Sequence, residues 1–222
     1  MEPPIKVAIV DDHAIARYGI EQILARQPGF AVVCSVGSLA ELELDAVRPD
    51  IVVLDLMLGE SRVAPGQVKE LCARYRVLML SANARYRDII NAEQAGASYL
   101  AKAAADEDYI DAIRVVAAGG RYLSRQLADV IAAVDARYPG GIPALSSRER
   151  DILNCIAQGL TYRKTANELG ISENTVPDYI KRIHDKIGPG TMAHTMLTAI
   201  ILGEIDPEVI HGAQGNVQSD RA

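Results

Sequence analysis

The chain has 222 residues, 49% of them hydrophobic, and carries a formal net charge of −6. This length allows one or two domains with real hydrophobic cores. No apolar stretch reaches about 18 residues, and the segment Met1–Pro4 lacks the features of a secretory signal. Three widely spaced cysteines argue against a disulfide scaffold. We therefore expect a globular cytoplasmic protein without a membrane span.

Four apolar runs in the first 120 residues end in polar side chains. The runs and the residues that follow them are Ile5–Val10 with Asp11 and Asp12, Ile51–Leu54 with Asp55, Arg76–Leu80 with Ser81, and Ser98–Ala101 with Lys102. Such runs are typical of buried parallel strands. Together with Phe30–Val36 and the helical segments between them, they predict an α/β domain with a doubly wound, five-stranded parallel sheet. Ligands bind at the carboxyl edge of such sheets, so we expect the polar side chains to meet there.

The predicted elements continue in chain order beyond the first strand. Helices are expected with an apolar stripe from Ile15 to Leu24, over 38–46 with Ser38 as N-cap, and over 66–73, 86–95, 106–118 and 124–138, whereas 56–65 is expected to be a loop. Beyond a Pro/Gly linker at 139–143, a capping box at Ser146 and Glu149 opens an all-helical region. Its later helices are expected over 162–169, up to Ile187, and over 192–202. The predicted division is 1–120 for the sheet domain, 121–144 for a helical linker, 145–205 for a helical domain, and 206–222 for a disordered tail.

The residues predicted at the acidic edge of the sheet suit the binding of a cation and the transfer of a phosphoryl group. Asp11, Asp12 and Asp55 would repel one another unless a cation neutralised them, and Mg²⁺ suits carboxylate ligands. Asp55 beside the ion could act as a nucleophile toward a phosphoryl group, with Lys102 offsetting its charge and Ser81 donating a hydrogen bond. Each residue alone would be ordinary: an aspartate in a turn, a solvated lysine, a strand-end hydroxyl. Only the combination indicates phosphoryl chemistry.

The helical region contains the spacing of a helix-turn-helix. A small residue, a glycine and an apolar residue stand at Ala166, Gly170 and Val176, which allows two helices to cross closely around a left-handed turn. The second helix has a buried stripe, formed by Val176, Ile180, Ile183 and Ile187. Lys181 and Arg182 fall outside this stripe and could face nucleic acid. A plain helical bundle with a solvated basic face is the alternative, because residues 145–205 hold seven Lys+Arg and seven Asp+Glu.

The first 120 residues resemble a known family. The segments Val10–His13, Leu54–Met57, Leu80–Ala82 and Ala95–Lys102 are similar to the receiver domain of two-component response regulators over about 5–120. The resemblance implies Asp55 as phosphoacceptor, with Asp11, Asp12, Asp55 and the Met57 backbone carbonyl around Mg²⁺, and a sensor histidine kinase as partner. It also implies Ser81 and Tyr99 as a switch pair. An amphipathic Tyr99 ring with its hydroxyl at the surface is the alternative.

The helical region resembles the LuxR-type helix-turn-helix domain of the NarL/FixJ group. The similar segments are Leu145–Arg150, Ile156–Thr161 and Ile171–Val176. The resemblance implies a transcriptional regulator that binds double-stranded DNA as a homodimer, with the dimer contact around Met196–Ile201. The candidate DNA contacts are Lys164, Asn174, Thr175, Asp178, Tyr179, Lys181, Arg182 and Lys186.

The chain departs from the pattern of the receiver family after Asp55. Leu58 stands where this family usually has proline, and the loop before Gly66 is several residues longer than usual. Met57 stands two residues after Asp55, where a true phosphohydrolase would need a second acid. A phosphohydrolase is a rival hypothesis, and the lack of this acid argues against turnover on external substrates.

Further departures lie in the second helix of the predicted helix-turn-helix, here called the reading helix. Pro177 and Tyr179 replace the lysine and histidine that are usual at these positions in the family. If Ser172 were the N-cap, Pro177 would remove a helix hydrogen bond at a cost of about 3 kcal/mol. If Thr175 is the N-cap, which we prefer, Pro177 lies in the tolerant first turn and Asp178 completes a capping box. Asp178 would repel phosphate but could accept a hydrogen bond from a cytosine amino group, so either an unusual site preference or weak DNA binding is expected. A regulator that acts through protein contacts, with weak or lost DNA binding, is therefore the alternative function.

Overall fold

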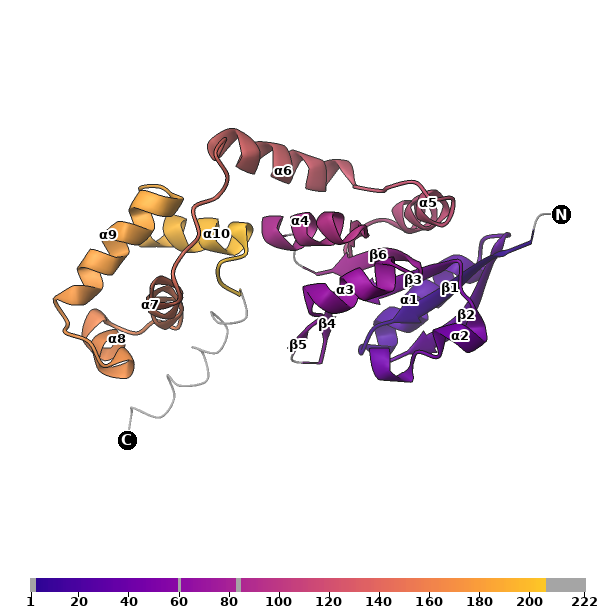
Figure 1. The fold of residues 1–222 in the computed structure, drawn as a ribbon, viewed down its shortest axis with the longest axis horizontal. Coiled ribbons are helices and arrows are strands. Elements are labelled where there is room, and N and C mark those ends of the chain that lie inside the picture. The colour runs from indigo at the N-terminus through magenta and orange to yellow at the C-terminus, as the bar shows by residue number, and fades with distance from the viewer. Residues whose placement is uncertain (1–2, 60, 83–84, 207–222) are drawn as a thin grey trace. The chain divides into compact units, whose positions relative to one another are not determined.

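The computed structural model describes residues 3–59, 61–82 and 85–206, which form two compact units. The first unit contains a five-stranded parallel sheet in the order β2-β1-β3-β6-β7 (Figure 1). Its strands are β1 (Ile5–Val10), β2 (Phe30–Val36), β3 (Ile51–Asp55), β6 (Arg76–Ser81) and β7 (Ser98–Ala101). The predicted fold class is confirmed, because the strands are parallel, alternate with helices, and are followed by an all-helical region.

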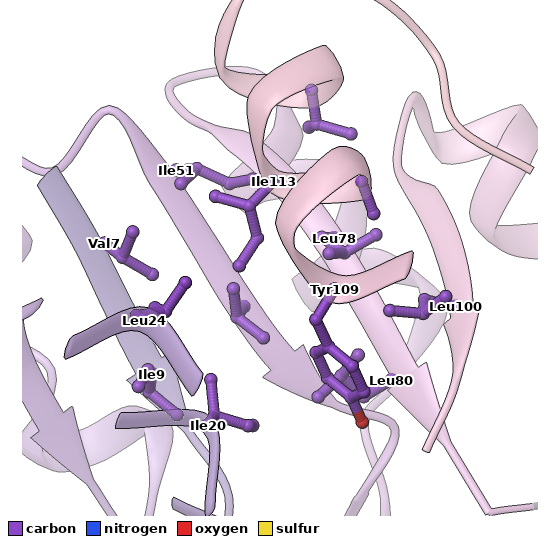
Figure 2. Packing of buried hydrophobic residues seen from close by; sticks show 13 residues of the cluster. Val7, Ile9, Ile20, Leu24, Ile51, Leu78, Leu80, Leu100, Tyr109 and Ile113 are labelled. Atoms are coloured by element: carbon purple, nitrogen blue, oxygen red, sulfur yellow. The ribbon is translucent and has the colours of Figure 1, made fainter. Parts of the chain in front are cut away.

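The core of the first unit lies between the sheet and two helices, α1 (Ala14–Ala25) and α5 (Asp106–Ala117). Figure 2 shows Ile20 and Leu24 of α1 and Ile113 of α5 directed at side chains of the strands. Strand residues alternate between the two faces, so the neighbours of these core residues point to the other side of the sheet. Those neighbours are fully buried as well: Ala8, Val10, Val52 and Leu54 are each 0% exposed. Burial on both faces explains why the strands are continuous apolar runs.

Three further helices belong to the first unit. They are α2 (Leu44–Val47), α3 (Pro65–Cys72) and α4 (Tyr86–Ala95), which belongs to this unit from Asp88 onward. The predicted helix over 38–46 is wrong as a single element: a 3₁₀ turn at Leu39–Glu41 precedes the four-residue α2. Ser38 precedes the 3₁₀ turn, but its hydroxyl bonds the Glu41 carboxylate and caps no backbone N–H.

The predicted loop over 56–65 is also wrong in part. It contains an antiparallel hairpin of β4 (Met57–Leu58) and β5 (Ser61–Arg62), in which Met57 pairs with Arg62. The hairpin is closed at its base by a 2.8 Å hydrogen bond from Val63 N–H to the Leu56 carbonyl. The extra residues of this segment therefore form an ordered element directly after Asp55.

Helix α6 (Arg125–Arg137) leads into the second unit, in which the structure describes four further helices. They are α7 (Ser147–Ala157), α8 (Tyr162–Leu169), α9 (Thr175–Ile187) and α10 (Met192–Leu202). The capping box of α7 is confirmed, since Ser146 Oγ accepts from Glu149 N–H and Glu149 Oε2 accepts from Ser146 N–H at 2.6 Å. Gly170 takes the left-handed conformation between α8 and α9, with φ 62°. The predicted stripe of α9 is buried in the helical core.

The predicted domain boundaries remain a prediction, and the predicted tail lies outside the described residues apart from Asp206. Across 3–59, 61–82 and 85–206, each helix is too short or too polar to cross a membrane.

The core packing predicts the effect of a substitution in α5. Ile113 is 0% exposed, so Ile113→Ala should destabilise the first unit by about 2–5 kcal/mol through lost burial and the cavity left behind. Val115 lies two residues away on the same helix and is 38% exposed, so Val115→Ala should change stability by only about 0.5 kcal/mol. Urea unfolding measures both values, and equal losses would contradict this packing.

Candidate functional site

Three aspartates and one lysine, at the ends of three strands, form an acidic pocket at the carboxyl edge of the sheet. Asp11 follows β1 and is fully buried, Asp55 ends β3 and is 2% exposed, and Asp12 is exposed. Lys102 follows β7, and its Nζ lies 2.6 Å from Asp11 Oδ2 and 2.7 Å from Asp55 Oδ2. The structure thus brings together the residues that the parallel topology was expected to gather.

Burial and charge perturb the acids of this pocket in opposite directions. Burial raises the pKa of Asp55, and the negative charge of Asp11 adds to this, although hydrogen bonds from Lys102 and from Met57 N–H lower it. Partial burial would also raise the pKa of Asp12, but the hydrogen bond from Gly59 N–H and the neighbouring His13 hold it below its ordinary value. Burial would lower the pKa of Lys102, yet its hydrogen bonds to the two aspartates raise it. An ionised Asp55 is therefore only partly compensated by Lys102.

The donor set fits a hard divalent cation. Ligand atoms of Asp11, Asp12, His13 and Asp55 all lie within 4.8 Å of one another. Carboxylate oxygens at this density suit Mg²⁺, which binds through a few carboxylates together with water and phosphoryl oxygens. The chain therefore has an acidic pocket of the kind that holds Mg²⁺.

Two further predicted residues lie on the strands beside the pocket. Ser81 ends β6 and is buried, and its carbonyl accepts a 2.8 Å hydrogen bond from Lys102 N–H. Tyr99 in β7 is 2% exposed, so the alternative with its hydroxyl at the surface is wrong for this structure. Sequence reasoning missed Tyr109 of α5, whose hydroxyl donates to the Lys102 carbonyl at 3.0 Å. Only the apolar spacing of α5 hinted that this residue faces the sheet.

The outer face of α9 carries several of the candidate DNA contacts. Asn174, Asp178, Lys181 and Arg182 are exposed, and Thr175 and Tyr179 are half-buried. The Arg182 guanidinium lies over the Tyr179 ring, 5.2 Å from its centroid. Stacking of this kind holds a guanidinium in place and leaves its edge free to donate.

The start of α9 differs by one residue from the preferred interpretation. The N-cap is Asn174 rather than Thr175, and its side chain makes no capping hydrogen bond. Pro177 therefore occupies the third helical position, where the backbone N–H would have no partner within the helix, and it costs α9 no hydrogen bond. Asp178 comes one position too late to form the predicted capping box.

Two of the candidate contacts lie away from this face. Lys186 Nζ donates to Glu149 Oε2 at 2.7 Å and to the Ala144 carbonyl at 3.1 Å, so it closes the capping box of α7. Together with the backbone and hydroxyl of Ser146, this bond lowers the pKa of Glu149, although burial alone would raise it. Lys164 is exposed in the first turn of α8, where Thr161 caps the helix.

The last carbonyl of α9 is capped by residues that precede the helical domain. Arg137 Nη2 and the Tyr138 hydroxyl donate to the Ile187 carbonyl at 3.2 Å and 2.7 Å. Gly188 follows with φ 107°, and the Arg137 guanidinium occupies the space that a Cβ at this position would need.

Comparisons with known proteins agree with both units. Residues 7–114 match the model of the response regulator receiver domain, and residues 143–196 match that of the bacterial regulatory proteins of the luxR family. The nitrate/nitrite response regulator NarL of Escherichia coli strain K12 is 32% identical over 195 residues, which cover 84% of this chain and 90% of NarL. The chain belongs to the NarL-like response regulators. It is a transcription factor with a receiver domain and a LuxR-type helix-turn-helix, and its family is not one of enzymes.

Other relatives and structures support this assignment. The transcriptional activator DevR/DosR of Mycobacterium tuberculosis is 32% identical to the regulator over 200 residues, covering 83% of the regulator and 88% of that relative. The crystal structure of the response regulator ChrA of a heme-sensing two-component system is 30% identical, has a TM-score of 0.52, and covers 92% of the regulator and 100% of ChrA. A structure of RcsB dimers on DNA shares the fold, with 18% identity, a TM-score of 0.60, and coverage of 90% and 99%. The receiver domain implies a kinase as the partner of the regulator.

The charge balance of the pocket predicts the effect of removing one carboxylate. Because the pKa of Asp55 is raised in the folded protein, its ionised form lowers stability once the pH exceeds the ordinary range of a carboxyl group. Without divalent cations at about pH 7, Asp55→Asn should raise the Tm by about 2–4 °C. The difference should shrink as the pH falls below the ordinary pKa of 3.8, toward about pH 3, where Asp55 is largely protonated in both states.

Differential scanning calorimetry measures this shift. Asp129→Asn alters an exposed carboxylate and should leave the Tm unchanged. A Tm for Asp55→Asn at or below that of the wild type would contradict the charge balance described above.

Proposed function

We propose that Asp55 accepts a phosphoryl group in a Mg²⁺-dependent reaction and that this charge controls DNA binding by the helical domain. The observation that carries the proposal is the contact of Lys102 with both Asp11 and Asp55 beside Asp12. An acidic cluster that also holds an ammonium group can bind a cation on one side and a phosphoryl group on the other.

Each side chain of the pocket has a role in the proposal. Asp11, Asp12, Asp55 and the backbone carbonyl of Met57 would hold Mg²⁺, which draws charge from the phosphoryl oxygens when bound. An Asp55 carboxylate oxygen forms the new bond to phosphorus as the bond between phosphorus and the donor nitrogen of a histidine kinase breaks. Lys102 balances the transferred charge.

Ser81 and Tyr99 would change conformation in response to the charge of the phosphoryl group. The Ser81 hydroxyl would turn to hydrogen-bond the phosphoryl group, and Tyr99 would follow in the space that this movement opens. Both residues are buried on the neighbouring strands β6 and β7. Ser81 at the end of β6 pairs with Ala101, two residues beyond Tyr99 in β7, so a movement of one side chain would affect the other.

The helical domain would bind double-stranded DNA as a homodimer in the cytoplasm. Lys181 and Arg182 on the exposed face of α9 would reach phosphates or base edges. Asn174, Thr175 and Tyr179 at the start of α9 would contact the same DNA, and Lys164 on α8 would contact its backbone. Leu197 and Ile201 of α10 are 58% and 39% exposed, one turn apart on one helix face, and would form the dimer contact. Two reading helices on one DNA face are about 34 Å apart, so a dimer should prefer an inverted repeat.

A second candidate function is regulation through protein contacts with weak DNA binding. Its support is the exposed Asp178 between Pro177 and Tyr179, together with the use of Lys186 in the cap of α7. A gel shift with a pool of random duplexes separates the two functions, because a DNA reader selects a subset of the pool and a protein-binding regulator leaves it unshifted.

Phosphotransfer tests the receiver pocket. Asp55→Asn should take up no label from a radiolabelled phosphodonor in the presence of Mg²⁺, because an amide is a poor nucleophile. The control Asp129→Asn should be labelled as fully as the wild type. Label retained on Asp55→Asn would refute the assignment of the phosphoacceptor.

Salt dependence tests the DNA face. Lys181→Ala should weaken DNA binding and reduce the slope of log K against log salt by about 1, since one phosphate contact is lost. Lys69→Ala removes an exposed lysine from α3 of the receiver domain and should change neither quantity. Fluorescence anisotropy over a series of salt concentrations measures both slopes, and an unchanged slope for Lys181→Ala would argue against its place on DNA.

A further inference from the structure

The β4–β5 hairpin contacts the acidic pocket through its backbone. Gly59 at its turn donates its N–H to Asp12 Oδ2 at 3.1 Å, and Met57 donates its N–H to Asp55 Oδ1 at 3.2 Å. Gly59 has φ 64°, a left-handed conformation that glycine adopts without strain. The position of the hairpin therefore fixes the direction of two carboxylates.

The other end of the hairpin is attached to α4. Arg62, which pairs with Met57 across the hairpin, forms an ion pair with Asp88 in the first turn of α4. Asp88 is 8% exposed and the Arg62 side chain is 31% exposed, so water screens this pair only in part. Leu56 and Val63 at the base of the hairpin line a cavity of ≈ 30 Å³ beside the pair.

We propose that Arg62 and Asp88 are positioning residues for the divalent cation of the pocket. The inference rests on the proposed function, because it concerns the Mg²⁺ site of that function. The ion pair holds the hairpin against α4, and the hairpin in turn presents the Met57 carbonyl and the Asp12 carboxylate to the cation. Ligand atoms that are already ordered bind a metal more tightly than ligand atoms that must be ordered on binding.

The charge of the pair accounts for its effect on the hairpin. Removing one charge of a buried ion pair is destabilising, because the attraction between the two charges no longer offsets the cost of their burial. Loss of the Arg62 charge would therefore release the hairpin from α4, although neither residue belongs to the proposed ligands. Residues that orient metal ligands typically change metal affinity by about 10–100-fold when they are substituted.

Titration of the full-length protein with MgCl₂ in a calorimeter tests the proposal directly. Arg62→Gln should raise the Kd for Mg²⁺ by about tenfold. With acetyl phosphate as donor, the Mg²⁺ concentration for half-maximal labelling of Asp55 should rise by the same factor, whereas the rate at saturating Mg²⁺ should change by less than about threefold. A residue with only a structural role would change stability without this separation.

Matched variants make the result specific. Arg74→Gln breaks an arginine–carboxylate pair with Asp45 that is exposed on the same domain, and should leave the Kd for Mg²⁺ unchanged. Asp88→Asn keeps the shape of the side chain and should weaken Mg²⁺ binding as Arg62→Gln does, even if Arg62→Gln fails to fold. The double variant Arg62→Asp/Asp88→Arg should recover most of the lost affinity.

The outcomes separate this inference from the proposed function. If the wild type binds Mg²⁺ and is labelled, but Asp88→Asn and a folded Arg62→Gln bind Mg²⁺ with unchanged Kd, the role of the ion pair is overturned and the proposed function stands. If the wild type neither binds Mg²⁺ nor is labelled, both are overturned. If the double variant stays as weak as the single variants, the charge of the pair is not the cause and the proposal is overturned.

Discussion

The ammonium group of Lys102 between Asp11 and Asp55 is the contact on which the receiver pocket depends. Two carboxylates at the buried end of a sheet are unfavourable unless a positive charge lies close to both. Lys102 provides that charge, yet the pKa of Asp55 stays raised, so the compensation is incomplete. The remaining negative charge, together with that of Asp12, is what a divalent cation can satisfy. The uncompensated negative charge of the pocket favours binding of a second cation, and this is the basis of the proposed chemistry.

The same contact determines how a transferred charge would be felt. A phosphoryl group on Asp55 adds about −1.5 to −2 charge and several oxygen acceptors. Lys102 is already placed to pair with it, and its backbone is held by the Ser81 carbonyl on one side and by the Tyr109 hydroxyl on the other. A change in the position of Lys102 would thus reach β6 and α5 through hydrogen bonds that the structure already contains.

The sequence predicted the parts of this molecule that depend on repeated patterns. The strands and their polar ends were recognisable because parallel strands buried on both faces must be apolar throughout. The buried stripe of α9 and the left-handed Gly170 were recognisable for similar reasons, since each follows from helix geometry and one turn. Burial of Tyr99 was left open, because a tyrosine has an apolar ring and a polar hydroxyl and suits either a core or a surface.

The β4–β5 hairpin and the use of Lys186 were not predicted, and both depend on contacts between distant residues. The hairpin has two residues in each strand, too few for an alternating pattern, and it is held by contacts of Gly59 with Asp12 and of Arg62 with Asp88. The sequence predicted Lys186 as an exposed DNA contact, whereas its Nζ lies 2.7 Å from Glu149 Oε2. The start of α9 was also predicted one residue too late. Asn174 rather than Thr175 is the N-cap, and the residue types at these two positions do not decide between them.

The cap on the last carbonyl of α9 has a practical consequence for dissecting the protein. Arg137 and Tyr138 provide the two donors to Ile187, and Val134 packs into the same helical core. A fragment that starts at residue 143, where the match to the luxR-family model begins, would lack all three. The C-terminal turn of its reading helix would then fray, and its weak affinity for DNA would reflect the truncation rather than the regulator. The shortest fragment that keeps these three residues and their contacts starts within α6.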